Sequence, residues 1–174
     1  MAQERKNVVT FKGNPMTLIG PALKPGDKAP EFEVIDQGLG PVTLASSKGK
    51  VRFFSAVPSL DTPVCSTQTK RLSEALKALG GAVQFYTVSA DLPFAQKRWC
   101  GAEGVNAVTL SDHRSLSFAE HYGILIKELR LLTRAIFVVD AADRITYVEI
   151  VPEITSEPNY EKAVAALKAT AGIQ

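Results

Sequence analysis

Two cysteines are the residues of this sequence best suited to chemistry. Cys65 lies in the segment PSLDTPVCST, three residues after Thr62, and Cys100 lies in KRWCGAEG. A thiolate is a strong nucleophile that can be oxidised reversibly, so the two cysteines can form a working redox couple. Two other interpretations stay open on the residues alone: two buried thiols that only pack, or two metal ligands.

The metal interpretation is the weakest of the three. His113 and His121 are the only histidines, and no CxxC or HExxH pattern occurs in the chain. Each histidine is expected to be a surface or packing residue, not the partner of a cysteine as in thiol hydrolases. Two cysteines in 174 residues are also too few for a disulfide scaffold.

The residues around Cys65 predict that it lies in the first turn of a helix. With Thr62 as the N-cap, Pro63 takes the first helical position, where its fixed φ suits the helix. Cys65 then takes the third position, where free N–H groups and the positive end of the helix dipole favour an anion. Helix N-termini lower the pKa of a cysteine thiol from its usual value of about 8.5. The sequence therefore predicts a stabilised thiolate at Cys65, with the Thr62 hydroxyl close to its sulfur.

Cys100 is expected near the end of a short helix that Pro93 opens. Lys97 and Arg98 precede it and indicate electropositive surroundings, and the two glycines of GAEG indicate a mobile segment. A disulfide requires two Cα atoms within about 4.4–6.8 Å of each other. If Cys65 is helical when reduced, its first turn must unwind, or the Cys100 segment must move, before the two sulfurs can bond.

The elements around Cys65 predict a β-α-β unit. A buried strand is expected over 51–57, a helix from 63 to about 79, and a second apolar strand over 82–90. Both strands are almost continuously hydrophobic, which is typical of a parallel sheet covered on both faces. Cys65 is therefore expected at a strand-to-helix junction.

The other elements extend this unit to a thioredoxin-like α/β fold with an N-terminal β-hairpin. The hairpin is predicted from strands over 8–12 and 17–20 around the turn Gly13-Asn14-Pro15. Residues 1–174 are expected to form one domain, with residues 1–24 as the hairpin extension. The remaining expected elements are strands over 32–36, 42–44, 107–112, 135–140 and 145–151, and helices over 115–122 and from Asn159 to Gly172.

Composition excludes several classes of function. Twenty basic residues stand against eighteen acidic ones, and no Lys/Arg block indicates a nucleic-acid partner. No apolar run approaches the roughly 18 residues that a membrane span needs, and the N-terminus lacks the apolar core of a signal peptide. We therefore expect a soluble, cytoplasmic protein that binds neither nucleic acid nor membrane.

The motifs around both cysteines resemble those of one known family. Pro58, Thr62 and Cys65 form the PxxxTxxC pattern of the peroxiredoxins. The segments SADLPFAQKRWCGAEG and LLTRAIFVVD are similar to those of the bacterial thiol peroxidases, a subfamily of atypical two-cysteine peroxiredoxins. The similarity covers essentially the whole chain, from FKGNPMTL to EITSEPNYEKAV. It implies a thioredoxin-type fold with an N-terminal hairpin, and peroxidase activity.

The resemblance also implies a role for each matching residue. Cys65 matches the peroxidatic cysteine, which attacks the peroxide and becomes a sulfenic acid. Thr62 matches the residue that orients the peroxide, and Pro58 the residue that shields the pocket from water. Arg134 matches the arginine that holds the thiolate and polarises the peroxide, although from the residues alone it would be taken for a surface charge. Cys100 matches the resolving cysteine, which closes an intramolecular disulfide with Cys65.

The implied enzyme reduces hydrogen peroxide and alkyl hydroperoxides, is recycled by thioredoxin and acts as a homodimer. It requires no metal or organic cofactor, because a thiolate beside a guanidinium and helix N–H groups supplies both nucleophile and charge stabilisation. Two alternatives come from other classes. The first, a thioredoxin-type disulfide oxidoreductase, is opposed by the absence of CxxC. The second is a redox sensor that uses the same disulfide as a switch.

Three further expectations concern individual side chains. Phe53 and Phe54 are neighbours on a strand, so at most one approaches the pocket, which leaves the preferred substrate size open. Glu153 and Glu157 are expected to be solvated acids that favour the N-terminus of the last helix. The aromatic residues expected in the core are Phe32, Phe85, Tyr86, Phe94, Phe118 and Phe137.

Overall fold

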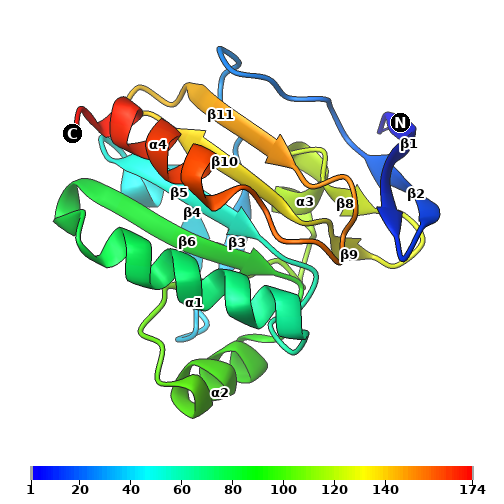
Figure 1. Ribbon diagram of the computed structural model, residues 1–174, viewed down its shortest axis with the longest axis horizontal. Helices are drawn as coiled ribbons and strands as arrows, with labels where there is room; N and C mark the ends of the chain where they lie inside the picture. Colours follow the sequence, from blue (N-terminus) through cyan, green and yellow to red (C-terminus); the bar gives the residue numbers. More distant parts are fainter. Residues whose placement is uncertain (1, 174) are drawn as a thin grey trace.

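A seven-stranded sheet forms the main layer of the computed structural model, which describes residues 2–173 (Figure 1). The strand order is β11-β10-β5-β6-β7-β3-β4. The three central strands β5, β6 and β7 are parallel, and the outer strands pair antiparallel. The strands are β3 (Glu33–Ile35), β4 (Pro41–Thr43), β5 (Val51–Ala56), β6 (Val83–Ser89), β7 (Thr109–Ser111), β10 (Ala135–Val139) and β11 (Ile145–Ile150).

A smaller sheet has the order β1-β2-β8-β9 and contains the expected N-terminal hairpin. Its strands are β1 (Glu4–Phe11), β2 (Asn14–Ile19), β8 (Leu125–Ile126) and β9 (Leu131–Leu132). The turn lies at Lys12-Gly13, so the predicted turn at Gly13-Asn14-Pro15 was wrong by one residue. Lys12 and Gly13 both have positive φ, 51° and 81°, as a two-residue turn with the right twist for a hairpin requires. The sequence did not predict β8 and β9, because strands of two residues carry too little pattern.

Helices cover both faces of the main sheet (Figure 1). On one face, α1 (Pro63–Lys77) and α4 (Tyr160–Ala171) pack on an apolar cluster that includes Leu72, Ile136 and Leu167. On the other face, α3 (Ser117–His121) contributes Phe118 to the largest apolar cluster. The remaining helices are α2 (Pro93–Glu103) and the single turns η1 (Leu44–Ser47) and η2 (Gly80–Ala82).

The β-α-β unit formed by β5, α1 and β6 confirms the predicted parallel arrangement. Phe53 and Phe54 point to opposite faces of β5 and pack in different clusters. Both are fully buried, and neither belongs to the apolar cluster around Cys65. The bulk of these two side chains therefore packs in the two main apolar clusters on either side of the sheet.

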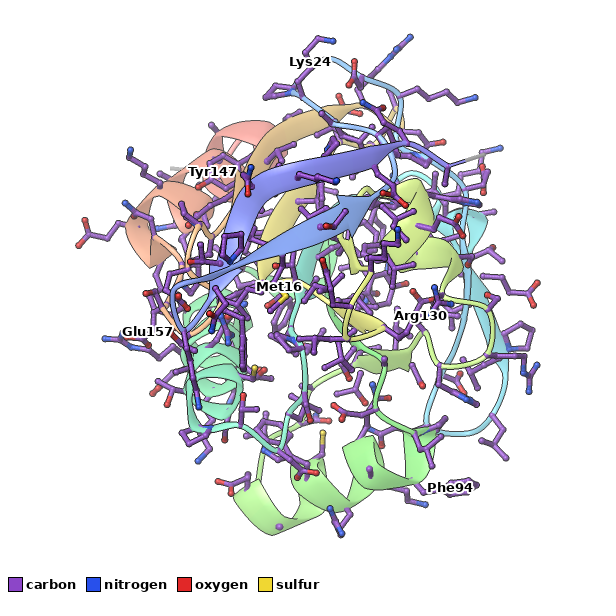
Figure 2. All side chains as sticks on the ribbon, turned by 90° about the vertical axis from the view of Figure 1, so that its right-hand side faces the viewer. Met16, Lys24, Phe94, Arg130, Tyr147 and Glu157 are labelled. Carbon is purple, nitrogen blue, oxygen red and sulfur yellow. The ribbon has the colours of Figure 1, made fainter. Side chains whose placement is uncertain are left out.

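Phe94 corrects one expectation about the core. It lies in the first turn of α2, is 67% exposed, and projects away from the protein (Figure 2). Its neighbour Leu92 is also exposed. None of the helices in residues 2–173 has the length and apolar character needed to cross a membrane.

Candidate active site

Cys65 lies in the first turn of α1, where the local sequence predicts it. Thr62 is the N-cap, Pro63 is the first helical residue, and the Thr62 hydroxyl oxygen accepts a hydrogen bond from the Cys65 N–H at 3.4 Å. The helix begins just beyond the carboxyl end of β5, at the edge where the central parallel strands end. Cys65 is completely buried and is a free thiol.

The Thr62 hydroxyl donates to the Ser59 carbonyl oxygen at 3.1 Å, so its proton is not directed at the Cys65 sulfur. The Thr62 hydroxyl lies near Cys65, as predicted, through its contact with the Cys65 N–H. Thr62 itself is exposed and ends the loop between β5 and α1, whereas Pro58 is buried near the start of that loop. Val57 and Leu60 of the same loop belong to the apolar cluster that contains Cys65.

Arg134 is the second charged group of the site, and it is only 2% exposed. Its Nη2 donates to the Cys65 sulfur at 3.2 Å and its Nε to the Ile154 carbonyl at 2.8 Å. Arg134 reaches the cysteine because β10 pairs with β5, and Ala135 lies opposite Ala56 at the end of that strand. The resemblance assigned Arg134 to the site, whereas its pattern alone suggested a surface charge.

Gln68 is a site residue that the sequence analysis missed. It is fully buried, its Oε1 accepts from Arg134 Nη1 at 2.7 Å, and its Nε2 donates to Ser55 Oγ at 2.8 Å. The available signal was spacing, because residues three apart on a helix share a face and Gln68 follows Cys65 at that distance. Gln68 fixes the plane of the guanidinium that faces the sulfur.

The charge of Arg134 has no carboxylate partner. Among the ion pairs of residues 2–173, none involves Arg134, and its partners are a carbonyl oxygen, an amide oxygen and the Cys65 sulfur. A buried charge is costly unless a counter-charge or hydrogen bonds compensate it. Hydrogen bonds to the Ile154 carbonyl and the Gln68 amide oxygen compensate part of this cost, and the Cys65 sulfur is the remaining partner of the guanidinium.

The N-terminal hairpin braces the segment that holds Arg134. Thr10 of β1 exchanges backbone hydrogen bonds of 2.8 Å with the segment 152–154: its N–H donates to Pro152 and its carbonyl accepts from Ile154. The Ile154 carbonyl then accepts from Arg134. The hairpin therefore supports the active site through one short segment of chain.

Glu153 holds the hairpin and the segment 152–154 together. A solvated acid near the N-terminus of α4 was expected at this position, and its carboxylate is instead engaged in hydrogen bonds. Its carboxylate accepts hydrogen bonds from the Thr155 hydroxyl and N–H, from the Gly13 N–H and from the Thr10 hydroxyl. These bonds, those from Thr155 first, lower the pKa of Glu153 to about 2. The other expected free acid, Glu157, is engaged by Arg71 and the Tyr160 hydroxyl.

Asp91 holds the loop that carries Pro58 and Thr62. Its carboxylate accepts from Ser59 Oγ at 2.7 Å and from the Leu60 N–H at 2.8 Å. Asp91 follows β6 and leads into α2, so it links the loop before α1 to the helix that carries the second cysteine. The sequence analysis did not identify this residue.

Cys100 lies in the last turn of α2, half-buried and free. Its neighbour Trp99 belongs to the apolar cluster of Val57, Leu60 and Cys65, and Cys100 packs against the same cluster. The glycines after Cys100 were expected to indicate mobility, but Gly104, at φ 64°, is the left-handed residue that ends the helix.

The expected electropositive surroundings of Cys100 are offset by acidic partners. Arg98 pairs with Asp61 at 3.6 Å, and Glu103 at the end of α2 pairs with Lys70 of α1. No cluster of three or more metal-ligating side chains occurs within residues 2–173. His121 lies 2.6 Å from the Glu31 carbonyl.

The fold and the site together define a class of protein. A central β-α-β unit places a buried cysteine at a helix N-terminus, and a buried arginine contacts its sulfur, in a thioredoxin-like fold of the peroxiredoxin type. A family model described as Redoxin matches residues 24–164. Among solved structures, a peroxiredoxin-like protein from Aquifex aeolicus aligns with a TM-score of 0.88 and 43% identity, covering 97% of this chain and 98% of that one.

Curated relatives narrow the class. A thiol peroxidase of Halalkalibacterium halodurans is 59% identical over 162 residues, which are 92% of this chain and 97% of that protein. A thiol peroxidase of Bacillus subtilis is 54% identical over 162 residues, which are 92% of this chain and 96% of that protein. The chain belongs to the thiol peroxidases of the Redoxin family, and it is a peroxiredoxin-type oxidoreductase.

Proposed function

We propose that the protein reduces hydrogen peroxide and alkyl hydroperoxides by a two-cysteine cycle, with Cys65 as the peroxidatic residue. The observation that carries this proposal is the 3.2 Å contact between Arg134 Nη2 and the Cys65 sulfur, made by a buried cation that forms no ion pair with a carboxylate of residues 2–173. A thiolate in this position has both the charge and the confinement that a nucleophile needs.

In the first step, the Cys65 thiolate attacks one peroxide oxygen. The S–O bond forms, the O–O bond breaks, and the leaving alkoxide or hydroxide takes up a proton to give an alcohol or water. Cys65 is then a sulfenic acid, oxidised by two electrons while the peroxide is reduced by two. Arg134 donates to the oxygens as charge develops on them, and Thr62 turns its hydroxyl from Ser59 to the bound peroxide.

Burial of the sulfur governs which peroxides reach it. Cys65 has no exposed surface and packs in an apolar cluster with Val57, Leu60 and Trp99, whereas Thr62 is exposed. A peroxide must therefore enter from the side of Thr62 and displace apolar contacts as it does so. We expect hydrogen peroxide and slender alkyl hydroperoxides to react faster than bulky ones.

In the second step, Cys100 attacks the sulfenic acid and closes an intramolecular disulfide. Both cysteines are helical as free thiols, in α1 and α2, and we propose that the first turn of α1 unwinds or the Cys100 segment moves to bring the two sulfurs together. Thioredoxin then reduces the disulfide by thiol–disulfide exchange. The cycle uses no metal or organic cofactor, and we assign it to a cytoplasmic homodimer in which residues 1–174 form one domain.

Stopped-flow oxidation of the reduced protein tests this function. Trp99 is the only tryptophan and donates to Ser66 Oγ at 3.3 Å, so its fluorescence reports on the contact between α2 and α1. We expect one phase whose rate depends on peroxide concentration, a second that does not, and the mass of an internal disulfide at the end. Steady turnover should require thioredoxin. Slow oxidation that stops after one equivalent would favour the redox sensor instead.

A further inference from the structure

The thiol of Cys100 has one side-chain hydrogen-bond partner in the described part of the chain, and that partner is Gln37. Its Nε2 donates to the Cys100 sulfur at 3.5 Å and to Thr109 Oγ1 at 2.6 Å. The Cys100 thiol also points to the Ala107 carbonyl oxygen at the longer distance of 4.0 Å. The amide nitrogen of Gln37 thus uses both of its hydrogens, one on a strand residue and one on the sulfur.

Gln37 is held firmly in place by the turn between β3 and β4. The Asp36 carboxylate accepts from the N–H groups of Gly38 and Gly40, which closes the turn. Ile35, the last residue of β3, pairs antiparallel with Ser111, and Gln37 follows it by two residues and bonds to Thr109 of the same strand β7. The amide is therefore anchored beside the thiol from a turn that carries neither cysteine.

The other anchors of α2 act elsewhere on the helix. Trp99 bonds to Ser66, and Glu103 pairs with Lys70, which connects α2 to α1. Gln96 donates to Ser89 Oγ at 3.0 Å and ties the helix to β6. None of these three anchors involves the Cys100 sulfur, whose contacts are with Gln37 and, at the longer distance, with Ala107.

We propose that Gln37 is a positioning residue that docks the Cys100 thiol and thereby slows disulfide formation. This inference rests on the proposed function, in which Cys100 resolves the sulfenic acid of Cys65. In that step the S–S bond forms, the S–O bond of the sulfenic acid breaks, and its hydroxyl leaves as water with the proton of Cys100. In this proposal the Cys100 sulfur gives up the Gln37 amide before it attacks.

The dock also sets how long the sulfenic acid of Cys65 survives. A second peroxide converts a sulfenic acid irreversibly to a sulfinic acid, and this reaction competes with the attack by Cys100. A slower release of Cys100 therefore raises the fraction of enzyme lost at high peroxide concentration. The Gln37 contact thus holds the reduced thiol in place, and it also increases the fraction of enzyme lost to the sulfinic acid.

The variants Gln37→Met and Gln37→Leu test the dock. Met keeps the length of the side chain and Leu is a shorter apolar side chain, and neither has an N–H group to donate to the sulfur. In stopped-flow measurements, the second phase should accelerate roughly two- to tenfold, as expected from the loss of one hydrogen bond. The first phase should not change, and the sulfinic fraction at high peroxide, measured by mass, should fall.

A control variant and the possible outcomes separate this inference from the proposed function. Lys70→Met removes the ion pair with Glu103 at the end of α2 and leaves the contacts of the Cys100 sulfur in place. The rate of its second phase should therefore be closer to the rate in the unmodified protein than the rates of the Gln37 variants are. An unchanged or slower second phase in both Gln37 variants would overturn the docking role and leave the proposed cycle intact. A folded unmodified protein that consumes peroxide without ever forming the internal disulfide would overturn both.

Discussion

The surroundings of the two cysteines differ in how firmly they are built. Cys65 is fully buried at a helix N-terminus, and its sulfur faces a guanidinium that Gln68 and the Ile154 carbonyl hold in place. Cys100 is half-buried near the end of an eleven-residue helix, and its sulfur has long contacts to Gln37 and Ala107. Cys65 is therefore enclosed by its surroundings, whereas Cys100 is held only by weak contacts to its sulfur.

This difference matches the two tasks in the proposed cycle. Cleavage of a peroxide bond is fastest when the charged groups are already in place, because no reorganisation is then needed in the transition state. Disulfide closure instead requires a sulfur to travel, which a locally weak segment permits. The chain therefore combines a rigid nucleophile with a releasable partner.

Removal of the Cys65 sulfur should have the largest effect. We expect Cys65→Ser to lower peroxide turnover by at least about a thousandfold, since a hydroxyl is a far poorer nucleophile than a thiolate. Steady-state peroxide consumption measures this loss, and thermal unfolding checks that the variant is folded. Turnover retained at the level of the unmodified protein would remove Cys65 from the role of nucleophile.

Replacement of the guanidinium should have the next largest effect. Arg134→Lys keeps the positive charge but cannot contact the sulfur, Gln68 and Ile154 together, so we expect the first oxidation to slow by about a hundredfold. The rate of the peroxide-dependent phase is the measurement. Arg98→Lys is the matched control, because Arg98 is exposed and pairs only with Asp61. Equal rates in the two variants would contradict the assigned role of Arg134.

Loss of the Cys100 thiol should affect the two steps of the proposed cycle differently. We expect Cys100→Ser to keep the first oxidation within about twofold while thioredoxin-dependent turnover falls more than tenfold, because no thiol remains to trap the sulfenic acid. The sulfenic acid should then accumulate and be detectable by mass after trapping with a reagent specific for it. Full multiple turnover in this variant would show that Cys100 does not resolve.

The smallest expected effect is at Glu153, whose hydrogen bonds hold the segment 152–154 against the N-terminal hairpin. Glu153→Gln replaces one acceptor oxygen with a donor where Thr10, Gly13 and Thr155 all donate, so the first oxidation should slow a few-fold as the Ile154 segment loosens. The lowered pKa of Glu153, about 2, is below its usual value of 4.5. Its stabilising contribution is therefore present above pH 4.5 and is lost as the pH falls toward 2.

Acid unfolding checks the same brace. The unmodified protein should lose stability more steeply than Glu153→Gln over this acidic range, because the variant has no carboxylate to protonate at that position. Circular dichroism as a function of pH is the measurement. Parallel acid-unfolding curves for the two proteins would contradict the brace.

Local features of the fold could be predicted because they depend on neighbours in the chain. The N-cap Thr62, Pro63 and the position of Cys65 form one helical turn, and the structure confirms all three. The parallel strands β5 and β6 followed from their continuous hydrophobicity, and the helix cap at Asn159 also matches. In each of these cases the local structure is decided by interactions within a few residues or by the hydrophobicity of a single strand.

Contacts between distant segments could not be predicted in this way. The contact of Arg134 with Cys65 exists because β10 pairs with β5, and the contact of Gln37 with Cys100 exists because β3 pairs with β7. No local sequence pattern distinguishes an arginine that is buried against a partner from an arginine that faces water. Phe94 is the opposite case, an aromatic residue that the helix directs outward.

The sequence alone thus determined where Cys65 lies and which helix turn presents it, since capping and hydrophobic periodicity are short-range effects. The tertiary structure decided which groups face each sulfur. That choice depends on strand register and on the anchoring of the N-terminal hairpin at Glu153, which bring together residues far apart in the chain.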